Sequence, residues 1–371
     1  MIIGIDVSAV QYNTGVSNYT LNLVRNLIKI DKVNSYKLFF TSLRQKLPKD
    51  IEVLGINKNV SIYSFKYPIS FFELIWNRLR ILPVEMFIGK CDVFHTSDWT
   101  QPPTIKAKTL TTVHDLVPFL YPEWSNKKII DAHTRKMQLA QKKAKHFICV
   151  SKNTQKDLLR LFPKINSINT SVVYEAAEDK YGKSSSLKNT VISKQYGLVK
   201  YFLCQGTREP RKNLPRIIEA FSIFKTKYPK SSFELVISGK YGWGKDVIQF
   251  KRPDIKILGF IPEKNMVALH AAAFCLVYPS LYEGFGLPVI KSLKVGVPVI
   301  TSAASSMSEI AGSAAIYVNP KSVDSIFKAM EKICRNSQIR KQLKISGKKI
   351  AANFSWQKTA KTTLNIYKAI C

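Results

Sequence analysis

A glutamate, two glycines and a proline follow an apolar, strand-like segment in the second half of the chain. The run reads Tyr278-Pro279-Ser280-Leu281-Tyr282-Glu283-Gly284-Phe285-Gly286-Leu287-Pro288-Val289-Ile290. Glycines let the backbone turn sharply, and proline is tolerated in the first turn of a helix. A helix that begins here points free N–H groups and its positive end at an anion, so the run predicts an anion site. A purely structural turn is the alternative.

Two basic residues stand in a second loop, Gly206-Thr207-Arg208-Glu209-Pro210-Arg211-Lys212-Asn213, directly after an apolar segment. Arg211 offers a planar fork of donors and Lys212 a compact cation, and the two together suit a diphosphate. In a chain this basic, a solvated surface pair is the alternative. The position at the end of a predicted strand favours phosphate binding.

Two smaller features follow strand-like segments in the first half. Asn13-Thr14-Gly15-Val16-Ser17 opens a helix, and Gly15 would let the backbone approach a phosphate or a sugar. A plain tight turn is equally compatible. His114 ends another apolar segment and could donate a hydrogen bond or transfer a proton near neutral pH. A histidine satisfied inside the structure is the alternative for His114 and also for His95.

Short apolar segments alternate with helical patterns, such as Val16 to Ile30, along the whole chain. This alternation is typical of βαβ units and predicts the α/β class with two Rossmann-like sheets. Ligands of such sheets bind beyond the carboxyl ends of the strands, so we expect the site in a cleft between the two sheets. The predicted strands are 2–6, 36–40, 60–65, 93–96, 109–114, 147–150 and 171–174 in the first half, and 201–206, 233–238, 255–258, 273–278, 298–301 and 316–318 in the second.

The length of 371 residues suits two domains rather than one. A polar stretch around Glu178 to Lys194, which includes Ser184-Ser185-Ser186, separates the two βα halves. We therefore predict a first Rossmann-like domain over 1–180, a linker over 181–198 and a second Rossmann-like domain over 199–354.

The charge balance is strongly basic. Lys and Arg number 57 against 25 Asp and Glu, a formal net charge of +32, which favours a phosphorylated substrate, an anionic membrane surface or nucleic acid as partner. Lysine richness from AT-rich coding is the alternative. Nucleic acid is disfavoured because the basic residues are dispersed and match no nucleic-acid-binding motif. Six scattered cysteines, no signal-peptide pattern and no apolar run of about 20 residues predict buried thiols in a cytoplasmic protein, with any membrane attachment peripheral.

The run from Pro279 to Pro288 resembles the signature of the retaining glycosyltransferases of family 4, whose members have the GT-B fold of two Rossmann-like domains. The resemblance covers nearly the whole chain. It implies that residues 355–371 form a last helix that crosses back to the first domain. The other segments that agree with the family are Thr14-Gly15-Val16, His114-Asp115, Gly206 to Asn213, Ser238-Gly239-Lys240, Val297-Pro298-Val299-Ile300 and Phe354-Ser355-Trp356.

This resemblance implies a role for each motif. The cationic pair would hold the diphosphate of a nucleotide sugar, the loop 283–287 would contact the transferred sugar, and residues 259–261 would lie near the base. Neither a metal ion nor a cofactor is expected, because no Asp-x-Asp motif occurs and cations at a helix N-terminus can stabilise a departing diphosphate. The implied catalytic residues are His114 and Glu283, and the implied donor-binding residues are Gly15, Gly206, Thr207, Arg211, Lys212, Phe260, Ile261, Glu283, Gly284, Phe285, Gly286, Leu287 and Lys291.

One position departs from the family pattern. A second glutamate is expected eight residues after Glu283, and Lys291 stands there. The family carboxylate accepts hydrogen bonds from the donor ribose, whereas lysine only donates. Three explanations are open: a natural variant in which Lys291 contacts ribose or phosphate oxygens, an engineered change, or a protein that binds without turnover. Because Glu283, Arg211, Lys212 and His114 all persist, activity is favoured.

The predicted function is transfer of a sugar, with mannose expected, from a GDP- or UDP-linked donor to a glycan or polyprenyl-diphosphate-linked acceptor in polysaccharide biosynthesis. The run from Tyr67 to Arg80, with the basic residues Arg135-Lys136, Lys142-Lys143 and Lys145, predicts docking on an anionic membrane surface, and a core helix with a solvated face is the alternative. Rival functions are a catalytically impaired nucleotide-sugar- or glycan-binding protein and a nucleotide-sugar epimerase. A dehydrogenase is disfavoured because no G-x-G-x-x-G turn follows an early strand.

Overall fold

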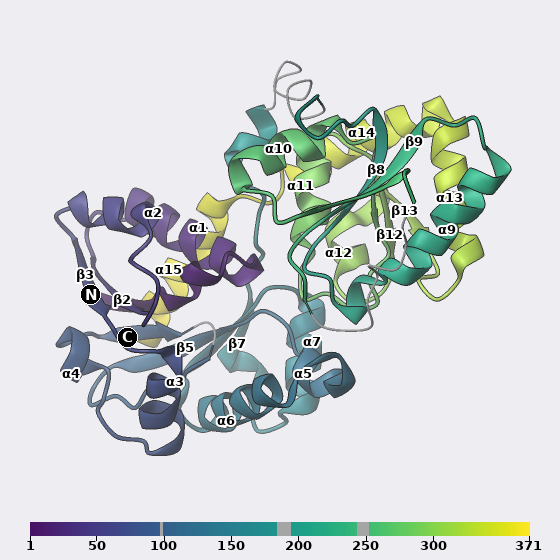
Figure 1. The fold of residues 1–371 in the computed structure, drawn as a ribbon. Helices are drawn as coiled ribbons and strands as arrows, with labels where there is room; N and C mark the ends of the chain where they lie inside the picture. The colour runs from purple at the N-terminus through teal and green to yellow at the C-terminus, as the bar shows by residue number, and fades with distance from the viewer. Residues whose placement is uncertain (97–98, 184–193, 243–251) are drawn as a thin grey trace. The chain divides into compact units, whose positions relative to one another are not determined.

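The structure is a computed structural model, and it describes residues 1–96, 99–183, 194–242 and 252–371. The chain divides into two units (Figure 1). Unit 1 comprises Met1–Glu175 and Trp356–Cys371, and unit 2 comprises Ala176–Ser355. Most of the predicted linker, including Ser184-Ser185-Ser186, lies outside the described residues.

Each unit is built on one parallel sheet. In the described residues the strand order is β3-β2-β1-β4-β5-β6-β7 in unit 1 and β10-β9-β8-β11-β12-β13 in unit 2. The order reverses beside β1 and beside β8, as in doubly wound sheets that bind ligands at this point. The strands are β1 (Ile2–Asp6), β2 (Ser35–Thr41), β3 (Val60–Phe65), β4 (Val93–Thr96), β5 (Lys108–Val113), β6 (His146–Cys149), β7 (Thr170–Val172), β8 (Lys200–Gln205), β9 (Phe233–Ser238), β10 (Ile255–Gly259), β11 (Cys275–Tyr278), β12 (Val299–Ser302) and β13 (Ala315–Val318). The predicted α/β class is confirmed, and each predicted strand is present with ends that differ by at most two residues.

Two long helices, α1 (Gly15–Ile30) and α15 (Trp356–Ile370), pack against each other in unit 1. A capping box starts α1, because the Thr14 hydroxyl accepts from the Ser17 amide and the Ser17 hydroxyl accepts from the Thr14 amide at 3.0 Å. The helix predicted over 16–30 is thus confirmed. The α15 helix is fixed in unit 1 by the Thr359 hydroxyl, which donates to the Tyr174 carbonyl at 2.6 Å.

The aromatic run that begins at Tyr67 is partly core and partly surface. It forms α3 (Ile69–Phe72) and a π-helical turn (Glu73–Arg78). Phe72 and Trp76 are buried in an aromatic cluster, whereas Tyr67 is exposed. The expectation that Lys136 meets lipid headgroups is wrong, because its side chain is buried on α6.

The remaining helices of unit 1 are α2 (Lys49–Glu52), α4 (Glu85–Ile88), α5 (Val117–Leu120), α6 (Lys127–Lys143) and α7 (Lys152–Leu161). Those of unit 2 are α9 (Leu214–Lys227), α10 (Glu263–Ala272), α11 (Leu287–Val295), α12 (Met307–Ala311), α13 (Val323–Arg335) and α14 (Ser337–Ala351). The helices α9 and α13 cover one face of the unit 2 sheet and share a core with β8, β9 and β11. The helix α11 packs against α10, α12 and α14.

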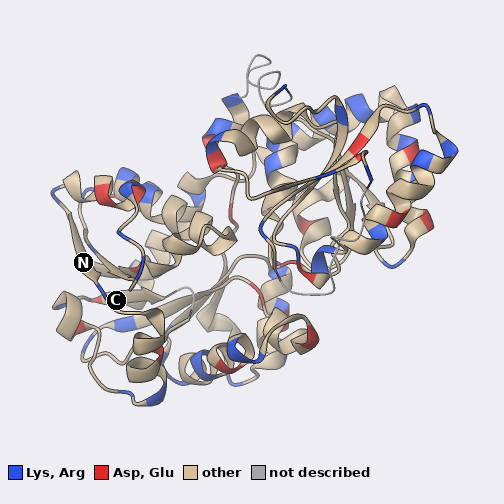
Figure 2. Ribbon diagram, in the orientation of Figure 1, with Lys and Arg blue, Asp and Glu red and all other residues tan. Residues whose placement is uncertain are grey.

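Lys and Arg residues are spread over the helices and loops of both units (Figure 2). Four of the six cysteines are buried as predicted, but Cys334 is half-buried and Cys371, the last residue, is exposed. Over the ranges that the structure describes, no helix is long and apolar enough to cross a bilayer.

Candidate functional site

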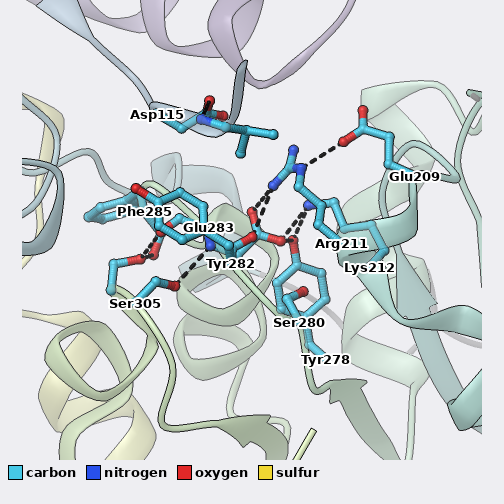
Figure 3. A network of polar contacts seen from close by, with 12 residues as sticks. Asp115, Glu209, Arg211, Lys212, Tyr278, Ser280, Tyr282, Glu283, Phe285 and Ser305 are labelled. Carbon is cyan, nitrogen blue, oxygen red and sulfur yellow. Dashed lines mark hydrogen bonds and ion pairs between the residues drawn. The ribbon is translucent and has the colours of Figure 1, made fainter. Parts of the chain in front are cut away.

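Glu283 lies at the centre of a buried ion-pair network in unit 2 (Figure 3). It follows β11, and its cationic partners follow β8, the neighbouring strand in the sheet. Arg211 Nη1 donates to Glu283 Oε2 at 2.5 Å, and Lys212 Nζ donates to Oε1 at 2.6 Å. The Tyr278 hydroxyl donates to the same Oε1 at 2.8 Å. The parallel sheet therefore joins the two strongest sequence motifs at one edge.

The charges in this network fix its protonation. Burial alone would raise the pKa of the Glu283 carboxyl, but Arg211 and Lys212 lower it to about 2, so the group is ionised at neutral pH. Burial and the neighbouring Arg211 lower the pKa of Lys212, and Glu283 opposes that effect. Arg211 Nε also donates to Glu209 Oε2 at 2.7 Å. The guanidinium is thus held between two carboxylates.

Asn213 joins the cationic loop, residues 206–213, to the glutamate loop, residues 279–286, through its side chain. Asn213 adopts the left-handed conformation with φ 61°, which is uncommon outside glycine. Its side-chain amide donates to the carbonyls of Pro279 at 3.0 Å and Pro320 at 2.6 Å. The Leu281 amide in turn donates to the Arg211 carbonyl at 2.8 Å. The cations are therefore positioned by backbone contacts as well as by their charge.

The glutamate loop turns at Gly286, directly before α11. Gly286 has φ 109°, and a Cβ there would lie 2.4 Å from the Met307 side chain, so the turn requires glycine. The amide of Glu283 donates to the Ser305 hydroxyl at 2.8 Å, and the Ser306 hydroxyl donates to the Phe285 carbonyl at 2.9 Å. The sequence did not indicate a role for these two serines, because serines after strands are common and their hydrogen-bond partners are set only by the packing of distant segments.

The loops after β8, β9 and β10 meet at the same edge of the sheet. The Gly206 amide donates to the Ser238 carbonyl at 2.9 Å, and the Gly239 amide donates to the Gly259 carbonyl at 2.7 Å. Gly206 and Thr207 therefore lie beside Ser238-Gly239-Lys240. Phe260 is half exposed with the Lys240 ammonium 5.1 Å from its ring centroid. Ile261 is buried, so its side chain belongs to the core.

Lys291 pairs with a residue that the sequence did not single out. Its side chain is buried on α11, and its Nζ donates to Glu263 Oε1 at 3.0 Å. Glu263 begins α10, two residues after Ile261. Lys291 thus belongs to a second ion-pair cluster, separate from the one around Glu283. Its pairing could not be foreseen because Glu263 lies 28 residues earlier in the chain.

His114 and Gly15 belong to unit 1 and follow β5 and β1. His114 Nδ1 lies 3.3 Å from Glu175 Oε1, and its ring packs edge-on against Tyr19 of α1 with centroids 4.6 Å apart. Its Nε2 is buried and has no hydrogen-bond partner among the described residues. Gly15 is exposed as the first residue of α1. His114 therefore contacts α1 through Tyr19, on the same helix that Gly15 begins.

His95, by contrast, is a structural residue. Its Nδ1 lies 2.7 Å from the Tyr367 hydroxyl and its Nε2 lies 2.8 Å from the Thr112 hydroxyl. Burial lowers the pKa of His95 to about 3, so the ring is neutral. The sequence could not distinguish His95 from His114, and the two differ in the hydrogen-bond partners that the fold gives to their ring nitrogens. Among the described residues, no group of three or more His, Cys, Asp or Glu side chains is placed to hold a metal ion.

Solved structures with the same fold cover essentially the whole chain. The glycosyltransferase WaaG, which is involved in lipopolysaccharide biosynthesis, matches 99% of this chain and 99% of its own with a TM-score of 0.73 at 13% identity. The two Rossmann-type sheets thus define a GT-B fold, the class of architecture expected from the sequence.

The sequence comparisons place the chain within that class. Residues 189–350 match the profile of the glycosyl transferases group 1, and residues 13–177 match that of glycosyltransferase family 4. O-antigen chain mannosyltransferase B of Escherichia coli is 27% identical over 374 residues, 96% of each chain. O-antigen chain mannosyltransferase RfbU of Salmonella typhimurium is 27% identical and covers 86% of this chain and 88% of its own. The chain belongs to the retaining glycosyltransferases of group 1 and family 4.

Proposed function

We propose that this glycosyltransferase moves mannose from a nucleotide diphosphate donor to a growing bacterial surface glycan. The observation that carries the proposal is the ionised Glu283 held between Arg211 and Lys212 at the carboxyl edge of a Rossmann-type sheet. Mannose as the sugar and a polysaccharide as the product are supported by the full-length similarity to two O-antigen mannosyltransferases.

The charge on the segments 206–213, 238–240 and 281–287 suits the diphosphate of such a donor. Four cations and two carboxylates give 4 − 2 = +2, and a diphosphate that links a nucleoside to a sugar is doubly ionised at neutral pH. The excess positive charge is therefore matched to the ligand. The residues in this sum are Arg208, Arg211, Lys212 and Lys240 against Glu209 and Glu283.

In the proposed reaction, Arg211 and Lys212 bind the diphosphate and Glu283 accepts hydrogen bonds from sugar hydroxyls. The bond from the anomeric carbon to the diphosphate oxygen breaks, and the acceptor oxygen bonds to the same face of that carbon. The acceptor proton passes to the departing diphosphate, whose charge the two cations stabilise. His114, whose Nε2 is unpartnered within the described chain, would donate a hydrogen bond to the sugar.

The acceptor is proposed to be glycan-linked or polyprenyl-diphosphate-linked and reached at an anionic membrane surface. This rests on Leu79, Ile81 and Met86 of unit 1, which are exposed by 54%, 47% and 63% in a stretch of the chain that also carries the exposed Arg78. Flotation with phosphatidylglycerol vesicles should recover the protein, and a Leu79→Ser/Ile81→Ser variant should be recovered several-fold less. Equal recovery of both proteins, or none of either, would refute the membrane contact.

A donor screen tests the central proposal. Binding and turnover of GDP-mannose, UDP-glucose and UDP-N-acetylglucosamine would be measured with the full chain and with Arg211→Ala/Lys212→Ala. Losing two charge-assisted hydrogen-bond donors should weaken donor binding on the order of a hundredfold or more. Lys227→Ala/Lys328→Ala removes the same charge from α9 and α13 and should bind normally.

Two outcomes would redirect this proposal. Binding that depends on Arg211 and Lys212 but gives no turnover, even with lipid-linked acceptors, would favour the alternative of a binding protein impaired in catalysis. Equal binding by both double variants would mean that the donor does not use the cationic loop.

A further inference from the structure

The cluster around Lys291 holds one carboxylate in a fixed place. The ammonium is buried, with the side chain 5% exposed, and donates to Glu263 Oε1 at 3.0 Å. The hydroxyl of Tyr181 donates to the same oxygen at 2.8 Å, and the Lys291 ammonium lies 5.0 Å from the Tyr181 ring centroid. Glu178 Oε1 is 3.9 Å from Lys291 on another side. A buried ammonium enclosed in this way holds Glu263 and is not itself presented to a ligand.

Glu263 has one oxygen engaged and one available. Lys291, Tyr181 and Lys180, the last at 3.5 Å, all approach Oε1. Within the described ranges, Oε2 receives no hydrogen bond, and the side chain is 39% exposed. Burial would raise the pKa of Glu263, but the charges of Lys291 and Lys180 lower it, so the group is an ionised acceptor at neutral pH.

Glu263 lies just beyond the carboxyl end of a strand, where doubly wound sheets bind their ligands. It starts α10 just past the carboxyl end of β10, three residues after the half-exposed ring of Phe260. Lys291 lies on α11, which begins directly after the Glu283 loop. His270 joins the two helices to the end of β8, because its Nδ1 lies 2.7 Å from Ser292 Oγ on α11 and its Nε2 lies 2.5 Å from Gln205 Oε1. These two hydrogen bonds connect α10, which Glu263 begins, with α11 and the end of β8.

We infer that Glu263 accepts hydrogen bonds from the ribose hydroxyls of the nucleotide, and that Lys291 is the positioning residue that holds it. Two neighbouring hydroxyls are donors that an ionised carboxylate recognises, and an acidic residue past a strand end performs this task in Rossmann sheets. The lysine in place of the expected glutamate is then compatible with donor binding, because the carboxylate comes from α10. This inference rests on the proposed function, since it requires a nucleotide donor.

The test compares nucleotides with and without the two hydroxyls. Dissociation constants of GDP, UDP and their 2′,3′-dideoxy forms would be measured for the wild type, Glu263→Gln and Glu263→Ala. The wild type should prefer the ribonucleotide by roughly tenfold or more, and both variants should reduce the preference to below about threefold by weakening only the ribonucleotide. Glu178→Gln is the matched control, because it removes a carboxylate near Lys291 and should keep the preference.

The role of Lys291 is tested by the preference for the ribonucleotide over the dideoxynucleotide, which a general loss of stability would not change. Lys291→Met should lower the ribose preference while leaving dideoxynucleotide binding within about twofold, and Lys291→Arg should restore it. A preference that survives in Glu263→Gln and Glu263→Ala, with binding still dependent on Arg211 and Lys212, would overturn this inference and leave the proposed function intact. Failure of every nucleotide to bind the wild type would overturn both.

Discussion

Replacing Glu283 with glutamine removes the buried negative charge that Arg211 and Lys212 share. The pKa of this carboxyl, about 2 in the folded protein against an ordinary value of 4.5, corresponds to about 3 kcal/mol of stabilisation. Breaking a buried pair by removing one partner costs a similar amount, about 3 to 5 kcal/mol. We therefore expect Glu283→Gln to lower the free energy of unfolding by about 3 kcal/mol at pH 7.

The pH dependence of this loss follows from the sign of the pKa shift. Because the folded pKa lies below the unfolded value, the stabilisation is complete above about pH 4.5 and is lost as the pH falls towards 2. Urea denaturation of wild type and variant should thus give a constant difference between pH 7 and pH 5, and a shrinking one below about pH 4.5.

The control is Asp324→Asn, which breaks an ion pair with Lys328 on the exposed face of α13. Both side chains are more than 60% exposed, at 68% and 63%, so the expected loss is below about 1 kcal/mol. If Glu283→Gln lowered the free energy of unfolding by no more than this control at pH 7, the ion-pair network around Glu283 would not stabilise the fold.

Two further substitutions probe the same edge of the unit 2 sheet. Gly239→Ala should lower the melting temperature by several degrees, a loss of at least about 2 kcal/mol, because Gly239 has φ 142° and its Cβ would lie 1.9 Å from the Gly206 carbonyl oxygen. An unchanged melting curve would show that the two loops can separate. Lys291→Glu should lower the free energy of unfolding, measured by urea denaturation, by about 3 kcal/mol, because a third carboxylate would face Glu263 and Glu178. A Lys291→Glu/Glu263→Lys exchange should recover part of this loss, and no recovery would contradict the pairing.

The fold was predictable because its signals are local. Parallel strands covered on both faces are short apolar runs, and each such run became a strand. Where a strand end differed from its prediction, it did so by one or two residues, since the last residue of a strand is set by its neighbour in the sheet rather than by its own sequence. The class of fold followed from the alternation of these runs with helical patterns.

Burial of charged and polar residues was not predictable in the same way. Lys136 belongs to a basic stretch that suggested a solvated surface, and the fold buries it on α6. His95 lies within the predicted strand 93–96 and His114 ends the predicted strand 109–114. His95 has both ring nitrogens paired, whereas His114 keeps Nε2 without a partner among the described residues. These outcomes depend on neighbours from distant segments.

The sequence by itself determined the two βα halves, the loops that follow their strands, and Arg211, Lys212 and Glu283 as the residues most suited to an anionic donor. Tertiary structure alone decided that these three form one network, because Glu283 lies 72 residues from Arg211 and 71 from Lys212. It also decided that Lys291 holds Glu263. The physical reason is that hydrogen-bond and ion-pair energies act over a few ångströms, and only the parallel sheet brings such separated side chains within that distance.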